Sequence, residues 1–157
     1  MEMRKAIMAL CLMCATMVSA QGIGNIRFGT TYDEAVTDIK ASLGEPVSSD
    51  ANVVTYKNIS FKGFEWNEIT FRFKNGKLAE ARCYMNHKNK RLATAKLSEI
   101  ANIMENEHVM SMDYEEDGNL FYAGGRSPMG VGHLFTIFIS PRNGIWTTQM
   151  RFGPFSI

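Results

Sequence analysis

The stretch Ile69-Thr70-Phe71-Arg72-Phe73-Lys74-Asn75-Gly76-Lys77-Leu78 decides the fold that the sequence predicts. Apolar and polar residues alternate from Ile69 to Phe73, which is typical of a β-strand with one buried face. Asn75-Gly76 is a strong signal for a tight hairpin turn, and a second strand returns over 78–85. The sequence therefore predicts an antiparallel hairpin here.

The phase of the returning strand favours a bulged turn. A simple two-residue loop would place Glu80 and Arg82 on the apolar face of the first strand. A type I turn followed by a glycine bulge places Ala79, Ala81 and Cys83 there instead. We therefore predict the bulged turn.

A helix precedes this hairpin. Thr31 and Glu34 have the spacing of a capping box, in which two side chains satisfy free backbone donors at a helix start. Apolar residues then recur at helical spacing: Ala35, Val36, Ile39 and Leu43. Gly44 stands where a C-cap is expected and Pro46 prevents continuation, so we predict a helix over 32–43.

The second half of the chain repeats this order. In the first half, two short strand-like segments at 53–56 and 59–61 lie between the helix and the hairpin. In the second half, apolar residues at helical spacing predict a helix over about 91–106. Further strands are expected at 109–116, 119–122, 134–140 and 145–152, with turns at Asp117-Gly118 and Asn143-Gly144. The predicted fold is α+β, with tandem helix–antiparallel β-meander repeats over about 25–86 and 87–157 and with the helices packed on one sheet face.

The first 20 residues have the three parts of a secretory signal peptide. Arg4 and Lys5 precede an apolar run over 7–15, and Val18-Ser19-Ala20 supplies the small residues of a cleavage site. The run is too short to span a bilayer, which takes about 20 residues. We expect cleavage near Ala20, so that 21–157 is a single exported domain, periplasmic or secreted, without a transmembrane segment.

Removal of the signal peptide changes the composition. The chain has 17 basic and 16 acidic residues, and the expected mature domain keeps 15 of each, which argues against nucleic acid as a partner. Only Cys83 remains of three cysteines, so no intramolecular disulfide can form. An exported domain of this size without disulfides favours a protein of the bacterial envelope.

The motifs resemble a known family. Gly29-Thr30-Thr31, continued by Glu34 and by Leu43-Gly44-Glu45-Pro46, resembles the helix motif of the SmpA/OmlA outer-membrane assembly lipoproteins, and the hairpin over 69–78 is similar to the one that follows in them. Two such units in tandem resemble the β-lactamase inhibitor proteins, which implies binding of a protein by one sheet face. Cys11 and Cys14 each follow a bulky residue, so the chain lacks a usable lipid-attachment cysteine like that of the lipoproteins. It also lacks the disulfides of the inhibitors, and no family binding residue carries over.

No residue pattern predicts catalysis, a metal or a cofactor. His87, His108 and His133 lack metal-ligand spacing, and Cys83 sits mid-strand, where a small buried residue is expected. The acidic run 113–119 starts like a calcium loop, but position twelve is a glycine instead of the closing glutamate. Ser127 lacks the spacing of a serine nucleophile, and Pro128 removes a backbone donor beside it.

Four aromatic residues are the candidate partner-binding residues: Trp66, Tyr84, Phe138 and Trp146. Such residues are enriched at binding hot spots, but they also close the cores of small domains. The first hypothesis is a non-catalytic exported module that contacts an envelope or extracellular protein through a sheet face. The alternatives are an exported enzyme or small-ligand carrier, whose polar groups converge only in the fold, and a purely structural envelope protein.

Overall fold

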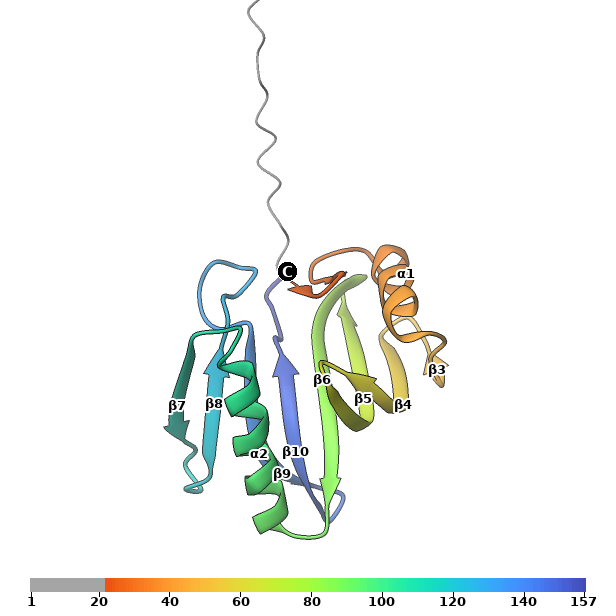
Figure 1. The fold of residues 1–157 in the computed structure, drawn as a ribbon. Helices are drawn as coiled ribbons and strands as arrows, with labels where there is room; N and C mark the ends of the chain where they lie inside the picture. Colours follow the sequence, from red (N-terminus) through yellow and green to blue (C-terminus); the bar gives the residue numbers. More distant parts are fainter. Residues whose placement is uncertain (1–21) are drawn as a thin grey trace, which may run out of the picture.

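An eight-stranded antiparallel sheet forms the centre of the computed structural model, which describes residues 22–157 (Figure 1). The predicted signal peptide lies outside the described residues. The elements are β1 (Gly22–Ile23), β2 (Ile26–Arg27), α1 (Tyr32–Leu43), β3 (Ser48–Ser49), β4 (Val53–Phe61), β5 (Phe64–Lys74), β6 (Lys77–His87), α2 (Lys90–Met104), β7 (Met110–Tyr114), β8 (Leu120–Gly124), β9 (Phe135–Arg142) and β10 (Ile145–Phe152). The strand order is β3-β4-β5-β6-β10-β9-β8-β7, and β1 pairs with β2 separately. The predicted α+β class is confirmed.

The β5–β6 hairpin corrects the predicted turn. Asn75 and Gly76 both have positive φ, 52° and 73°, and Lys74 pairs with Lys77, so the loop is a two-residue type I′ turn. A bulge between Arg72 and Phe73 then shifts the register. The turn type was wrong, but the bulge still brings the strand into the predicted phase, with Cys83 opposite Ile69 and Ala81 opposite Phe71.

The first helix has the predicted bounds and caps. The Thr31 hydroxyl accepts from the Glu34 N–H, and the Glu34 carboxylate accepts from the Thr31 N–H, which completes the capping box. Gly44 ends the helix with a φ of 79°. Its carbonyl accepts a 2.7 Å hydrogen bond from the Tyr56 hydroxyl of β4, and burial, with a smaller contribution from Glu45, raises the pKa of Tyr56 to about 12. The phenol therefore stays protonated and ties α1 to the sheet.

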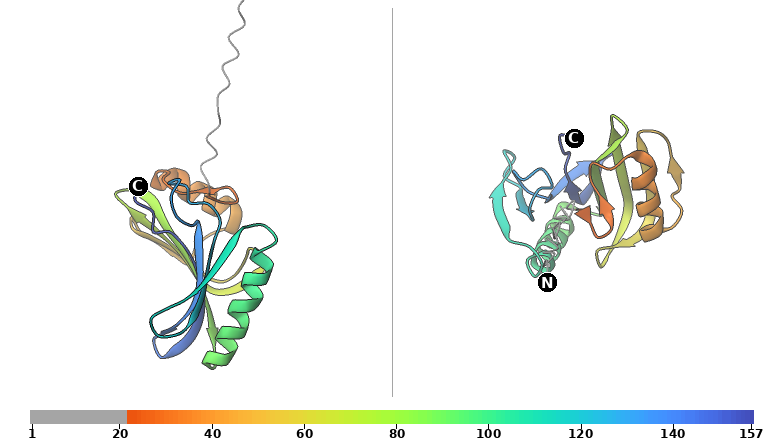
Figure 2. Two further views of the ribbon diagram at one scale, coloured as in Figure 1. Left: turned by 90° about the vertical axis from the view of Figure 1, so that its left-hand side faces the viewer. Right: turned by 90° about the horizontal axis from the view of Figure 1, so that it is seen from above.

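The second helix lies along the other half of the sheet (Figure 2). It begins one residue before its predicted start, because the Asn89 side chain accepts from the Leu92 N–H as an N-cap. It contacts β10 and β9. The Thr148 hydroxyl of β10 donates a 2.8 Å hydrogen bond to the Ala93 carbonyl, which fixes the helix against the strand.

Each half of the chain contains one helix and then four strands of the main sheet. The last strands of the two halves, β6 and β10, pair antiparallel from Trp146 opposite His87 to Phe152 opposite Ala81 and join the halves. The two segments predicted at 53–56 and 59–61 form the single strand β4, in which Asn58 has a φ of 49°. The short strands β1, β2 and β3 were not predicted.

The register of the four central strands, β5, β6, β10 and β9, assigns their side chains to two faces. The apolar face consists of buried residues: Ile69, Phe71, Ala81, Cys83, Phe135, Ile137, Met150 and Phe152. The polar face consists of Glu68, Thr70, Arg72, Glu80, Arg82, Tyr84, Thr136, Phe138, Arg142, Thr147, Gln149 and Arg151. Neither described helix is long and apolar enough to cross a membrane.

Candidate functional site

The polar face is ordered in rows that cross the four central strands. The aromatic row runs Glu68, Tyr84, Gln149, Phe138, each residue opposite the next on neighbouring strands. Two residues further along each strand, the arginine row runs Thr70, Arg82, Arg151, Thr136. Two of the four predicted partner-binding residues, Tyr84 and Phe138, therefore share one face and one row.

Arginine side chains cover both aromatic rings of this row. The Arg142 guanidinium lies 3.9 Å from the centre of the Tyr84 ring and donates a 2.7 Å hydrogen bond to Glu68. The Arg151 guanidinium lies 5.4 Å from the Phe138 ring centre. Both distances are within the range of cation–π attraction, which orients the guanidinium groups on this face. Tyr84 is only 3 % exposed beneath Arg142, whereas Phe138 is half-buried.

Acidic partners are unevenly distributed over the polar face. The Glu80 carboxylate lies 3.2 Å from the Arg82 guanidinium and 3.6 Å from that of Arg72. Arg142 is paired with Glu68. Within residues 22–157, no carboxylate lies within salt-bridge distance of Arg151. The arginines of this face thus outnumber its carboxylates.

The other two aromatic residues lie elsewhere. Trp66 is 1 % exposed, and its indole N–H donates a 2.9 Å hydrogen bond to the Phe61 carbonyl, so it is a core residue. Trp146 is half-buried at the start of β10, with the Lys90 ammonium 5.5 Å from its ring centre. Strand alternation puts Trp66 on the same side of β5 as Glu68, but Trp66 is fully buried, and of the four predicted residues only Tyr84 and Phe138 are covered by arginine side chains of the polar face.

Trp146 borders an open cavity of about 390 Å³. The lining consists of Asn86, His87, Lys88, Gly144, Ile145 and Trp146. His87 lies 2.9 Å from the Thr148 hydroxyl, and because that hydroxyl donates its only proton to Ala93, it accepts from the His87 Nε2–H. Burial, and secondarily the charge of Lys96, lowers the pKa of His87, which keeps the ring neutral. Among the described residues, the lining of this cavity contains no carboxylate or thiol beside the imidazole.

Among residues 22–157, metal-ligand candidates do not cluster, and the nucleophile candidate Ser127 lines an open cavity of about 270 Å³ together with His133, with no hydrogen bond between the two. In the described part of the chain, no three His, Cys, Asp or Glu side chains lie together as metal ligands. Within the acidic run, Asp117 accepts from the Asn119 N–H inside its own turn. The Ser127 hydroxyl accepts from the Met129 N–H. His108 is 3.9 Å from the Glu107 carboxylate, which is beyond hydrogen-bond distance.

Cys83 is buried in the apolar face. Its side chain is 0 % exposed, and burial raises the pKa of the thiol. Since the thiolate is the reactive form, we expect a thiol reagent such as dithionitrobenzoate to leave Cys83 unmodified in the folded protein at pH 8 and to react with it fully in denaturant. Stoichiometric reaction of the folded protein within seconds would contradict this placement.

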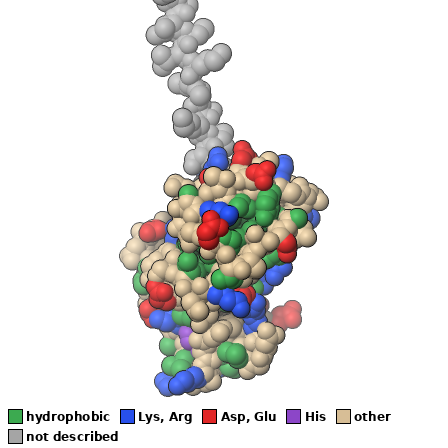
Figure 3. All heavy atoms as spheres, turned by 90° about the vertical axis from the view of Figure 1, so that its right-hand side faces the viewer, with side chains coloured by type: hydrophobic (Ala, Val, Ile, Leu, Met, Phe, Trp, Pro, Cys, Tyr) green, Lys and Arg blue, Asp and Glu red, His purple; other side chains and the backbone are tan. Residues whose placement is uncertain are grey.

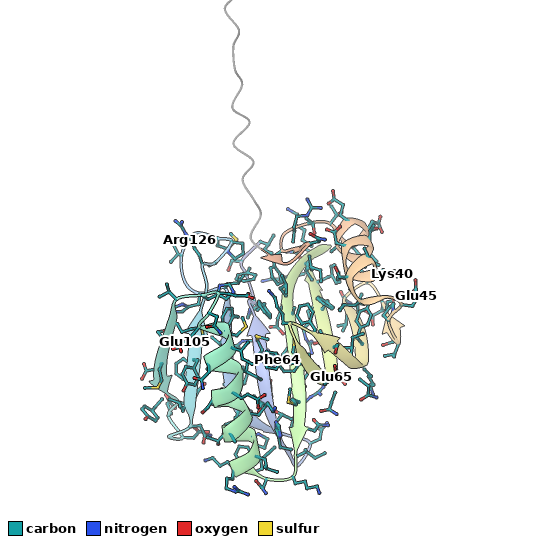
Figure 4. All side chains as sticks on the ribbon, viewed as in Figure 1. Lys40, Glu45, Phe64, Glu65, Glu105 and Arg126 are labelled. Carbon is teal, nitrogen blue, oxygen red and sulfur yellow. The ribbon has the colours of Figure 1, made fainter. Side chains whose placement is uncertain are left out.

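Charges outside the polar face are dispersed. Figure 3 shows acidic, basic and hydrophobic side chains mixed over the side formed by α1, β3 and β4. Figure 4 places the Lys40–Glu45 ion pair, 3.0 Å long, at α1 and Arg126 at the opposite end of the molecule, on the β8–β9 loop. These groups do not form a single charged patch.

Sequence reasoning did not single out the arginines and polar partners of this face. The available signal was the polar position of each alternating strand, where Arg72, Glu80, Arg82 and Arg151 occur. Alternation shows that such residues point away from the apolar face, but the pairing of β6 with β10 decides which of them meet. Compared with known protein families, curated proteins and solved structures, the chain matches none of them.

Proposed function

We propose that this protein is an exported, non-catalytic binding module of the bacterial envelope that contacts another protein through its polar sheet face. The observation that carries the proposal is the aromatic row, where Tyr84 and Phe138 lie two strands apart, each beneath a guanidinium group. Tyrosine and arginine are enriched among the residues that dominate binding energy at protein interfaces. Their cation–π contacts order the arginines before a partner arrives, which reduces the entropy lost on binding.

We infer that both helices cover the apolar face and leave the polar face to the partner. Tyr56, which binds the end of α1, pairs with Ile69 and so points to the apolar side. Thr148, which binds α2, pairs with Ile139 on the same side of the sheet. The equal order of elements in the two halves supports a tandem repeat whose units join at β6 and β10.

The export and the kind of partner rest on the sequence. The predicted signal peptide at 1–20 supports a periplasmic or secreted protein. The resemblance of the helix and hairpin motifs to the SmpA/OmlA lipoproteins, and of their tandem arrangement to the β-lactamase inhibitor proteins, supports a protein as the partner. The balanced charge of the expected mature domain is unsuited to nucleic acid.

The proposal is tested by photocrosslinking in the exporting cell. Benzoylphenylalanine replaces Phe138 in one strain and Tyr114 of β7, an exposed aromatic outside the polar face, in another. We expect a discrete higher-mass adduct with another protein from position 138 and at least tenfold less from position 114, because a benzophenone reacts only with groups in contact with it. The measurement is an immunoblot of the irradiated cells.

Expression and export of both variants are compared without irradiation as the control. Equal adduct yield at both positions, or no adduct at position 138, would contradict binding through the polar face.

A further inference from the structure

The arginine row brings two like charges together. Arg82 and Arg151 are direct cross-strand partners at the β6–β10 junction. Side chains in such positions start about 5 Å apart, and like charges directly opposite each other destabilise a sheet. The row is symmetric in residue type, because Thr70 pairs with Arg82 and Thr136 pairs with Arg151.

The carboxylates nearby do not balance this charge. Glu80 contacts both Arg72 and Arg82, and Glu68 is held by Arg142. The polar face therefore has four guanidinium groups against two carboxylates. Within the described residues, Arg151 is the arginine of this face that forms no salt bridge with a carboxylate.

Unsatisfied polar atoms gather in the same row. Six buried side-chain atoms of the described chain have no hydrogen-bond partner, and all six belong to the polar face. Four of them are the Oγ1 atoms of Thr70 and Thr136 and the Nε atoms of Arg82 and Arg151, so every residue of the arginine row has one. Thr70 is 5 % exposed, and an unpartnered hydroxyl at such depth costs stability. These four residues can donate hydrogen bonds and lack an acceptor, whereas the other two unpartnered atoms, the Oε1 atoms of Glu80 and Gln149, are acceptors beside the row.

We propose that the arginine row binds a carboxylate, supplied by an aspartate or glutamate side chain of the protein partner. This inference rests on the proposed function. A carboxylate has two oxygens, and each can accept a hydrogen bond from a guanidinium group. If the Arg82 and Arg151 side chains rotate toward the carboxylate, their buried Nε–H groups can donate to it as well. Phosphate sites are commonly built from helix N-termini and glycine-rich turns, whereas this row consists of strand side chains beside an aromatic residue.

The test uses a peptide of six glutamates, inorganic phosphate and chloride as probes at constant ionic strength. Residues 21–157 are titrated by calorimetry as wild type, Arg82→Gln, Arg151→Gln, Thr136→Val and the matched control Arg126→Gln from the β8–β9 loop. We expect the glutamate peptide to bind wild type and Arg126→Gln equally. Its dissociation constant is expected to rise at least tenfold in Arg82→Gln and Arg151→Gln and about threefold in Thr136→Val, since charge-assisted hydrogen bonds are the stronger ones.

Thermal unfolding without any probe separates a binding role from a structural one. Arg151→Gln is expected to raise the midpoint of unfolding, because it removes the repulsion with Arg82. An arginine that served mainly to stabilise the fold would lower the midpoint instead, and that result would overturn the proposal. Equal peptide binding by Arg151→Gln and Arg126→Gln, or no peptide binding by wild type, would overturn it as well.

Phosphate that binds as tightly as the glutamate peptide would overturn the choice of a carboxylate. The peptide titration needs no cellular partner, whereas the crosslink from position 138 does. Peptide binding at the row without that crosslink would refute the proposed function alone. A crosslink without peptide binding would refute only the carboxylate site.

Discussion

Trp66→Ala is expected to lower the free energy of unfolding by about 3–5 kcal/mol, the cost typical of removing a fully buried large aromatic side chain. Trp66 heads the largest fully buried side chains of the described chain, at 1 % exposure. Its ring lies 6.1 Å from that of Phe64, and its N–H is bonded to the Phe61 carbonyl. The substitution would leave a cavity and remove the side-chain hydrogen bond to the Phe61 carbonyl near the β4–β5 turn. Urea unfolding followed by circular dichroism measures the loss.

The matched control is Trp146→Ala. Trp146 is half-buried and borders an open cavity, so its removal creates little enclosed space. We expect a loss of about 1 kcal/mol, since the cost of truncation follows the volume left empty. Equal losses in the two variants would contradict the core position of Trp66. A loss below about 1 kcal/mol in Trp66→Ala would do the same, because a partner-binding tryptophan on the surface contributes little to stability.

Phe152→Ala is expected to destabilise the fold by about 3–5 kcal/mol as well, because it empties a buried position where distant parts of the chain meet. Phe152 is 1 % exposed on the last strand. Its ring lies 5.7 Å from Phe135 of β9 and 6.4 Å from Phe28, which follows β2 near the start of the described chain. A stability of 5–15 kcal/mol is usual for a domain, so about 4 kcal/mol is a large part of it. Thermal and urea unfolding give the difference.

A double-mutant cycle isolates the contact between the two ends of the chain. Phe28→Ala, Phe152→Ala and the double variant are compared, and we expect a coupling of about 0.5–1.5 kcal/mol for the aromatic pair. Phe61→Ala, at a half-buried position of β4, is the control for the loss of a phenyl ring. Strict additivity of the two substitutions would contradict the packing of Phe28 on Phe152.

Helix caps and strand alternation were predictable because they depend on neighbours in sequence. The Thr31–Glu34 capping box and the stop at Gly44 use groups within one helix, and the structure reproduces both. The turn at Asn75-Gly76 was located but its type was misjudged. The hydrophobic pattern showed only that the returning strand must shift by one residue to place Ala81 and Cys83 on the apolar face. A bulge within the strand pair produces this shift as well as a bulge in the turn, so the pattern could not distinguish the two.

The candidate site was predictable only in part. The sequence identified Tyr84 and Phe138 as candidates because they are aromatic. Only the structure shows that they lie in one row, because Gln149 of β10 pairs with both of them. The same choice included Trp66, which lies in the core, because residue type does not reveal which face of a curved strand is covered. The contact between Arg142 and Tyr84 could not be predicted, because the two residues are far apart in sequence and only the folded sheet brings them together.

The sequence by itself determined the elements: a capped helix in the first half, a second helix in the other, an Asn-Gly hairpin in each half, an α+β class and an expected export signal. These features follow from backbone hydrogen bonding and side-chain periodicity over a few residues. Only the tertiary structure decided that β6 and β10 pair, and this single contact makes one sheet of two halves. It also places Arg82 opposite Arg151, because the register between strands far apart in sequence is set by burial of the apolar face, not by the charges on the other side.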